Sequence, residues 1–344
     1  MSGLQQLRRS ARPVEGSAAH GLPQARWSPF EIAFWCVPIA VFFLLPDYLV
    51  FGSQVLIVGL FALSLDLVLG YAGIVSLGHA GFFGLGAYTA GLLAAHGWGE
   101  PLTGLAAGAV VAALAGFCVS FLVVRGQDLT RLMVTLGIGL MLYEAANKMA
   151  FLTGGVDGLS GVAMRNLLGT FEFDLEGRTA YFYSLVVLFL VFVGLRRLVR
   201  SPFGLSLRGI QQGPKRMPAI GANVRMRLVA AFTVSAAIAG VAGGLLAQTT
   251  QFVGLDSLGF SRSAELLIML VLGGAGRLYG ALIGAAVFMI AQDVLAGINP
   301  VYWQFWIGLL LMVIVLFARG GILGGLETAV SAVRARRARK GGAS

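Results

Sequence analysis

The sequence predicts an all-α integral membrane protein, a polytopic bundle of about eight to ten transmembrane helices with some broken or re-entrant segments. Of its 344 residues 58% are hydrophobic and only 12% are charged, whereas an average soluble domain carries about 25% charged residues. The 49 glycines point the same way, because small residues let transmembrane helices approach closely where lipid removes the hydrophobic drive for association.

The individual spans are predicted from apolar runs, since a helix needs about 20 mostly apolar residues to cross a bilayer. Several runs are short or interrupted by glycine. The stretch 264–296 can also be a single hairpin or a re-entrant pair, which would lower the count to about eight or nine. The predicted spans are 31–50, 52–70, 79–96, 102–124, 132–152, 181–199, 228–251, 264–276, 279–296 and 303–318.

The distribution of charge predicts the topology. The segment 196–227 carries basic residues and no acidic ones, and cytoplasmic loops are enriched in Lys and Arg. The segment 153–180 carries more acidic than basic residues and is expected on the outside, one span away. Counting from these two segments places both termini in the cytoplasm. The net charge of +10 is therefore attributed to topology and not to nucleic-acid binding.

Three regions are expected along the chain. Residues 1–30 are basic and lack the apolar core of a cleavable signal peptide, so they are predicted to be a disordered cytoplasmic tail. Residues 31–325 form the predicted transmembrane domain. Residues 326–344 form a second basic cytoplasmic tail. The polar segments between spans are too short to build a soluble domain with its own core.

Catalytic chemistry has little support in the sequence. No Lys is followed by Ser or Thr, so the phosphate-binding pattern GxxxxGK[ST] is absent and the chain is not expected to hydrolyse ATP. No His, Cys and carboxylate set has metal-ligand spacing. Cys36 and Cys118 both lie in apolar runs and are interpreted as packing residues. We therefore expect no catalytic residue, no metal and no cofactor in this chain.

The segment 70–88 is rich in glycine within an apolar context. Glycine is unfavourable inside a helix, so such a segment indicates close backbone packing, a helix break or the lining of a substrate pathway. Pathway lining and tight packing both remain open for the segment. An ordinary buried histidine also remains open for one of its residues, His79. The candidate pathway residues in this segment are Ser76, Gly78, His79, Phe82 and Tyr88.

Ionisable residues within or beside the spans are further candidates, because charge in lipid is costly and usually faces a cavity or a partner. Glu144 and Lys148 are spaced to pair on one helical face, and Glu144 could instead face the pathway. Asp157 lies in a glycine-rich outer segment, 153–161, that could contact substrate or simply close a helix. The remaining groups are Asp66, Glu265 and Asp293.

The segment 200–227 is a long basic loop, and Pro202, Gly204 and Pro214 interrupt it. A short amphipathic piece is expected within 205–212 or 215–222. A loop that only satisfies the positive-inside rule needs no such structure, whereas a docking element for a cytoplasmic partner does.

These segments together resemble the permease subunits of branched-chain amino acid ABC transporters, specifically the LivM type. The similarity runs from about residue 50 to 325, and it is the order and spacing of the motifs that make it specific. The motifs are LSLDLVLGYAG at 63–73, SLGHA at 76–80, GAY at 86–88, TGG at 153–155, DGLSG at 157–161, SPFG at 201–204, AGVAGGL at 239–245, ELLIM at 265–269, LGG at 272–274 and FARGG at 317–321.

The resemblance implies a set of partners in a bacterial inner membrane. A second, related permease pairs with the chain, and two cytoplasmic ATP-binding cassette subunits and an extracytoplasmic substrate-binding protein complete the importer. ATP and Mg²⁺ would then bind in the ATPase subunits. Within the coupling loop 200–227, Arg208, Gly221 and Asn223 match the family best. Pro214, Arg216 and Met217 depart from its pattern, and proline argues against a continuous coupling helix.

The resemblance leaves the substrate open among branched-chain amino acids, urea, short amides and aromatic acids. An apolar pathway with few charges favours amino acids with apolar side chains. The alternative from another class is an ion-coupled secondary transporter with Asp66, Glu144 or Asp293 as the coupling carboxylate. A membrane scaffold or enzyme would need a convergent polar site that the sequence does not display.

Overall fold

The computed structural model describes residues 29–126, 128–166, 176–300, 302–317, 321, 322 and 324. The chain divides into two compact units, residues 1–39 and 40–344. The described part of the first unit is the start of α2 (Pro29–Leu44), and all other described elements belong to the second unit. The predicted tail 326–344 and nearly all of the predicted tail 1–30 lie outside the described residues.

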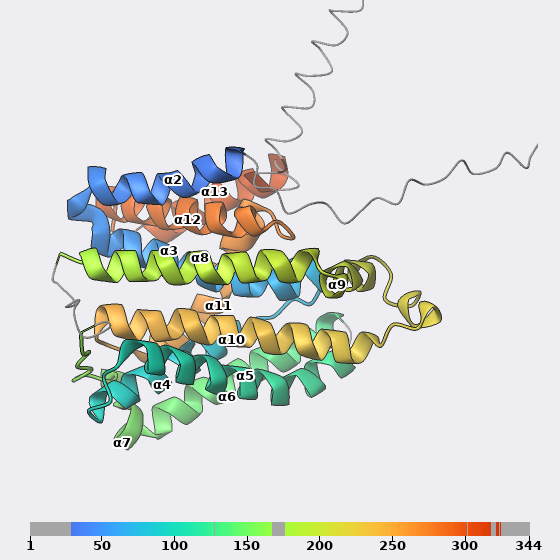
Figure 1. Cartoon of the computed structure of the whole chain (residues 1–344), viewed down its shortest axis with the longest axis horizontal. Coiled ribbons are helices and arrows are strands. Elements are labelled where there is room, and N and C mark those ends of the chain that lie inside the picture. Colours follow the sequence, from blue (N-terminus) through green and yellow to red (C-terminus); the bar gives the residue numbers. More distant parts are fainter. Residues whose placement is uncertain are drawn as a thin grey trace, which may run out of the picture. The chain divides into compact units, whose positions relative to one another are not determined.

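The helices follow the predicted spans, and the prediction of an all-α polytopic membrane protein is confirmed. Within the described residues there is no β-strand, and six helices are long and apolar enough to cross a membrane. In the second unit the long helices run side by side (Figure 1). The helices after α2 are α3 (Leu49–Asp66), α4 (His79–Ala95), α5 (Pro101–Arg125), α6 (Asp128–Lys148), α7 (Ala150–Thr153), α8 (Arg178–Arg200), α9 (Pro202–Gln212), α10 (Val224–Thr250), α11 (Phe260–Gly273), α12 (Leu278–Ile298) and α13 (Trp303–Phe317).

Several predicted boundaries are wrong, and α6, α10 and α11 each begin four residues earlier than expected. The predicted span 31–50 is not one helix, because α2 ends at Leu44 and a 3₁₀ turn, η1 (Pro46–Tyr48), separates it from α3. Proline lacks the N–H that would continue the helix and its ring clashes with the preceding turn. The predicted span 132–152 begins earlier and ends earlier, since α6 runs from Asp128 to Lys148 and α7 is a separate turn.

Two helices begin inside the bundle instead of at its ends. The α3 helix passes into a π-helical turn, η2 (Leu67–Tyr71), and irregular backbone over 72–78 leads to α4. The backbone N–H of Ala80 donates to Ser263 Oγ at 3.0 Å, so the first turn of α4 lies beside the first turn of α11. With 14 residues, α11 is about 21 Å long, shorter than the hydrocarbon core of about 30 Å. The prediction of broken or re-entrant segments is confirmed here.

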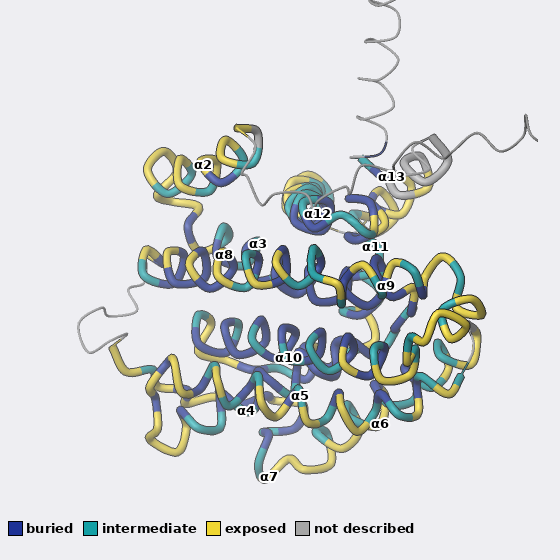
Figure 2. Tube along the Cα trace, turned by 45° about the vertical axis from the view of Figure 1, so that its right-hand side comes forward, coloured by how far each residue is buried: buried dark blue, intermediate teal, exposed yellow. Residues whose placement is uncertain are grey.

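The α10 helix is the centre of the second unit. In its most apolar stretch 72% of the residues are buried, against 6% in α6, and Figure 2 shows the same contrast along the trace. Glycines set this packing. A Cβ on Gly240 of α10 would lie 2.5 Å from the Ala112 Cβ and 2.6 Å from the Gly108 carbonyl oxygen of α5. A Cβ on Gly86 of α4 would overlap Gly240 itself. The three backbones are therefore in direct contact.

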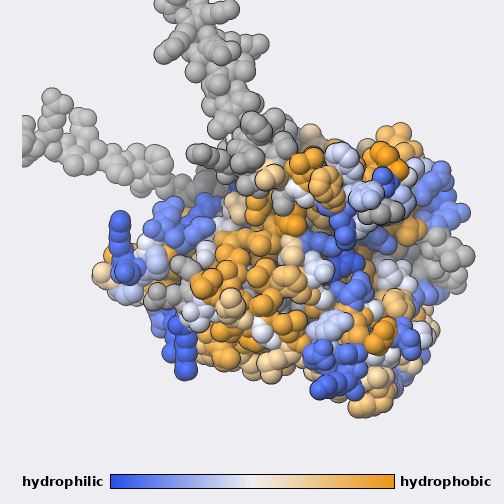
Figure 3. Space-filling model, turned by 180° about the vertical axis from the view of Figure 1, so that it is seen from behind, coloured by the Kyte–Doolittle hydropathy of each residue, from blue (hydrophilic) through white to orange (hydrophobic). Residues whose placement is uncertain are grey.

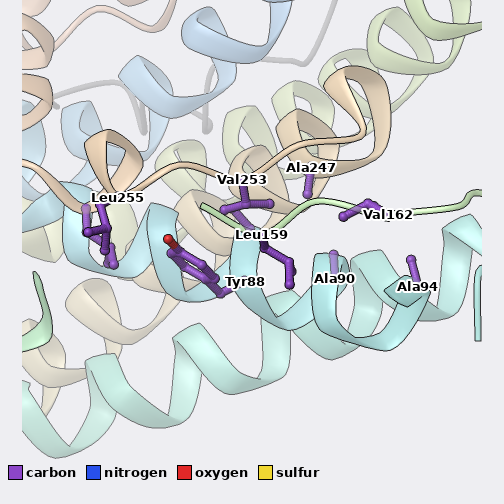
Figure 4. Packing of buried hydrophobic residues seen from close by; sticks show 10 residues of the cluster. Tyr88, Ala90, Ala94, Leu159, Val162, Ala247, Val253 and Leu255 are labelled. Carbon is purple, nitrogen blue, oxygen red and sulfur yellow. The ribbon is translucent and has the colours of Figure 1, made fainter. Parts of the chain in front are cut away.

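The segments that follow the C-terminal ends of α7 and α10 are tied together. The Leu159 N–H donates to the Val253 carbonyl at 2.8 Å, and the Val253 N–H donates back to Leu159 at 3.2 Å. Both side chains join a buried cluster against α4 (Figure 4). From Val253 the chain turns inward through a 3₁₀ helix, η5 (Leu255–Leu258), whose two leucines are also in the cluster, and then enters α11.

The surface is strongly apolar. Seen from behind, it shows wide hydrophobic areas with hydrophilic residues gathered toward the helix ends and in a strip between them (Figure 3). On α5 and α6, Leu114, Leu122, Met133 and Met141 are between 58% and 72% exposed. A soluble monomer rarely leaves so much large apolar surface uncovered. Lipid or another membrane-embedded chain must therefore cover these helices.

The packing of α10 predicts that replacing glycine by alanine changes stability differently at two positions. Gly240→Ala should destabilise the fold by about 1–3 kcal/mol, because the new methyl has no room against α5. Gly137→Ala in α6 is the matched control, since nothing lies within 4 Å of its added Cβ, and it should be neutral or slightly stabilising. Thermal unfolding of the purified protein measures both. Equal melting temperatures for the two variants would contradict the close-contact account.

Candidate functional site

His79 lies at the start of α4 in a fully buried polar cluster. Its Nε2 is 3.0 Å from Ser64 Oγ and 3.2 Å from Ser235 Oγ. Ser64 Oγ donates its proton to the Phe61 carbonyl at 2.6 Å, and Ser235 Oγ donates to the Ser64 carbonyl. Since each hydroxyl has only one proton to give, Nε2 must carry the hydrogen that the serine oxygens accept. Nδ1 is then an acceptor, and within the described structure it has no partner.

Aromatic side chains enclose the His79 ring. It stacks on Phe61 with ring centroids 5.9 Å apart and meets the edge of Phe82 at 5.8 Å. Phe82 in turn packs against Phe232 of α10. Ser76 is also fully buried, in the irregular backbone before α4. These three predicted site residues therefore meet around the helix break and are covered by protein.

Gly78 lies where the helix break meets α6. A Cβ at this position would overlap the Thr135 carbonyl, and Gly139 is also in contact. The Leu77 N–H donates to Thr135 Oγ1 at 3.2 Å, which satisfies one free donor of the irregular backbone. Close packing is thus a sufficient reason for glycine here, and a pathway role for Gly78 stays a prediction.

Asp66, at the end of α3, is bonded to the short connection between α11 and α12. Its Oδ1 accepts a 2.7 Å hydrogen bond from the Gly276 N–H, in the short connection between α11 and α12. Beside it, the Arg208 guanidinium of α9 lies 5.0 Å from the centre of the Tyr71 ring in η2. A contact path therefore leads from α9 through η2 and Asp66 to the connection between α11 and α12.

A cavity of about 240 Å³ opens between α3, α4, α10, η5, α11 and α12. Its polar side includes Thr250, Asp256, Arg262 and Glu265, and Arg262 lies 3.4 Å from the Asp256 carboxylate and 3.6 Å from that of Glu265. The rest of the wall is largely apolar. Its deepest members are at most 3% exposed and comprise Phe61, Phe83, Leu266 and Met269.

Comparison with known proteins places the chain. Residues 49–316 match the family described as the branched-chain amino acid transport system permease component. The chain belongs to this family. The permease is 30% identical to the high-affinity branched-chain amino acid transport system permease protein LivM of Escherichia coli K12, over 86% of this chain and 71% of that protein.

The other relatives agree with this placement. LivM of Salmonella typhimurium is also 30% identical, with the same coverage. LivH of Escherichia coli K12 is 24% identical over 77% of this chain and 90% of LivH. No solved structure matches. The resemblance read from the motifs, including its LivM type, is confirmed, and the permease is a multi-pass membrane protein.

The coupling-loop residues have separate places in the permease. Arg208 is exposed on α9, whose Gly204, Leu207 and Ile210 are buried. Gly221 adopts a φ of 80° at the end of a 3₁₀ turn, η4 (Met217–Ile220). Asn223 caps α10, with its side chain accepting a 3.2 Å hydrogen bond from the Met226 N–H. As the position of Pro214 predicts, no continuous helix crosses the loop.

The remaining predicted residues lie elsewhere. Tyr88 is in the outer buried cluster. Asp157 is exposed in a 3₁₀ turn, η3 (Gly155–Asp157). Glu144 and Lys148 are exposed on α6, and although both side chains are described, no ion pair joins them. The structure thus places His79 and Phe82 in ring contact, with Ser76 and Gly78 in the same helix break, and leaves Tyr88, Glu144 and Asp157 apart.

The cavity is not evident from the sequence. Glu265 is recognisable there as a charge within a span, but not as a site residue. Its partner Arg262 stands three residues earlier, a spacing that places the two on one helical face. An arginine and a glutamate at this spacing near the start of an apolar run were the available signal. No signal in the sequence indicates that α3, α4 and α10 line the same cavity.

Substitutions of Asp66 test whether its side chain acts as a hydrogen-bond acceptor for Gly276 or as an ionised carboxylate. Asp66→Ala should destabilise the permease by about 1–3 kcal/mol, because it leaves the partly buried Gly276 N–H without an acceptor. Asp66→Asn retains an acceptor oxygen and should lose clearly less, in stability and in transport. Thermal unfolding and uptake measure the two effects. Transport abolished in Asp66→Asn with stability intact would show that the ionised carboxylate itself is required.

Proposed function

We propose that this permease is one membrane subunit of an ATP-driven importer and forms half of its translocation pathway. The proposed cargo is branched-chain or other apolar amino acids. The observation that carries the proposal is the segment 202–223, in which α9 and η4 form a structured element beyond the end of α8 (Figure 1). The chain has no phosphate-binding loop of its own, so a partner must supply ATP hydrolysis.

The segment has the properties of a docking element. Its inward face is buried, while Leu205 is 50% exposed and Ile220 is 76% exposed. Exposed apolar side chains within a basic, cytoplasmic segment suit the surface of another protein. We assign this surface to two ATP-binding cassette subunits, which would hold ATP and Mg²⁺.

The path from α9 into the bundle supports mechanical coupling. Arg208 touches Tyr71, and Asp66, in the turn before Tyr71, is bonded to Gly276. Movement of α9 would therefore act on the turn that precedes the break at 72–78 and on the connection to α12. Both are irregular segments between helices, where a backbone can change direction at low cost.

The relatives and the motif resemblance support the remaining proposed partners. Their names include both LivM and LivH permease proteins, which favours pairing with a second, related permease. A substrate-binding protein would dock outside, where 153–161 is accessible in part. Both termini would be cytoplasmic in a bacterial inner membrane. The segment 70–88 and the helix of Glu144 remain the proposed pathway elements.

Uptake into vesicles tests the importer. Vesicles carry this permease with its second permease, with and without the ATPase subunits, and receive purified binding protein with leucine, urea or benzoate. We expect leucine uptake that requires ATP, the ATPases and the binding protein. Uptake by this chain alone that an uncoupler abolishes would instead establish an ion-coupled secondary transporter. Uptake of urea or benzoate in place of leucine would correct the cargo.

Arg208 provides a test of the coupling path. Arg208→Ala should lower ATP-driven uptake by about 2- to 30-fold, the factor equivalent to a cation–π contact of about 0.5–2 kcal/mol. ATP hydrolysis by the complex should continue, so the two activities become uncoupled. Arg225→Ala is the matched control, because Arg225 lies 5.9 Å from the Phe121 ring on α5 and is off this path. Equal uptake by both variants would exclude the path.

A further inference from the structure

The cavity separates charge from apolar surface. Asp256 and Arg262 form its mouth, where their side chains are 71% and 38% exposed, and Glu265 is 29% exposed. The opposite wall is made by the buried Phe61 and Phe83. A ligand that fills the cavity therefore meets charges of both signs at one end and hydrocarbon at the other.

The three charged groups do not satisfy one another fully. The separations of 3.4 Å and 3.6 Å exceed the 2.7–2.9 Å typical of a charge-assisted hydrogen bond. A guanidinium has five N–H donors, and that of Arg262 makes one hydrogen bond, a long one to Asp256, within the described structure. Donor capacity thus remains at Arg262, with a carboxylate on either side.

The position of this cluster suits a ligand. Ionisable groups among transmembrane helices commonly mark a ligand or ion pathway. Arg262 lines the cavity, and its side chain stays partly exposed.

From these features we infer that the cavity binds a zwitterionic α-amino acid with an apolar side chain. Arg262 receives the carboxylate, Glu265 and Asp256 receive the ammonium group, and the side chain lies against Phe61, Phe83 and Met269. The volume of about 240 Å³ is below the range of about 300–1,000 Å³ usual for drug-sized ligands and suits a small one. This inference rests on the proposed function and names a recognition site for its cargo.

The arrangement discriminates among the possible cargoes. Urea is neutral and small, so it uses neither the paired charges nor the apolar wall. An aromatic acid supplies the carboxylate but leaves Glu265 and Asp256 without a cation. Only a ligand that carries both charges beside hydrocarbon satisfies all parts. The permease therefore selects its cargo itself, in addition to any selection by a binding protein.

Direct binding tests the site without the transport cycle. The full-length permease in lipid nanodiscs is titrated with leucine, with 4-methylpentanoate, which lacks the ammonium group, and with 3-methylbutylamine, which lacks the carboxylate. The variants are Arg262→Gln and Glu265→Gln. The matched control is Arg178→Gln, which removes an exposed arginine paired with Glu176 at 2.8 Å and not part of the cavity.

The variants should respond in opposite ways. Arg262→Gln should weaken leucine binding by about 10-fold or more, the effect of losing a hydrogen bond to a charged group, and should weaken 4-methylpentanoate but spare 3-methylbutylamine. Glu265→Gln should weaken leucine and spare 4-methylpentanoate. Arg178→Gln should match the wild type for all three ligands. This crossed pattern is specific to charge recognition, because general damage to the fold would weaken every ligand alike.

Three results would overturn the inference. They are an absence of saturable leucine binding to the wild-type permease, leucine affinity in Arg262→Gln equal to that of Arg178→Gln, and equal loss of all three ligands in either cavity variant. Results that refute the proposed importer function differ from results that refute the binding site. Uptake without ATP would refute the proposed function while leaving the crossed binding pattern intact, and ATP-driven uptake with normal leucine affinity in Arg262→Gln would refute the site alone.

Discussion

Close contact between helix backbones is the constraint on which the rest of this permease depends. In lipid, apolar side chains gain little by leaving their surroundings, so helices associate through packing and backbone proximity. Gly86, Gly108 and Gly240 meet with no room for a side chain between α4, α5 and α10. Because α10 is fixed in this way, Ser235 lies beside His79, and η5 lies against α4. Both the helix break and the cavity mouth are built on this contact.

The two helices that begin within the bundle create the polar interior. A helix start leaves N–H groups without intrahelical partners, and here side chains of neighbouring helices take up some of them. Ser263 accepts from Ala80, and Thr135 accepts from Leu77. The first turns of α4 and α11 thus support each other. The same short start places Arg262 and Glu265 at the cavity instead of at the end of a full-length span.

Much of the fold followed from hydropathy, but the site followed only in part. Each predicted span overlaps at least one helix because about 20 apolar residues have few alternatives in a membrane. The span 31–50 was different: Pro46, followed by Asp47, ends the helix, whereas Pro38 lies inside it. Glycine density marks the break that holds Ser76, His79 and Phe82, and their role in a pathway stays a prediction. The cavity could not be predicted, since Phe61 and Arg262 are some 200 residues apart and only tertiary packing brings them together. For Glu144 and Lys148 the spacing was right, yet no ion pair forms.

The bridge between Leu159 and Val253 has a mechanical consequence. Two peptide hydrogen bonds join a segment at the outer surface to a residue only three positions before Asp256. Peptide hydrogen bonds transmit displacement with little slack, because their length and direction are narrowly defined. The segment 153–161 is therefore tied through main chain to the residues just before the mouth of the cavity. A load applied near Asp157 is carried to the entrance through main chain, whichever side chains line the surface between them.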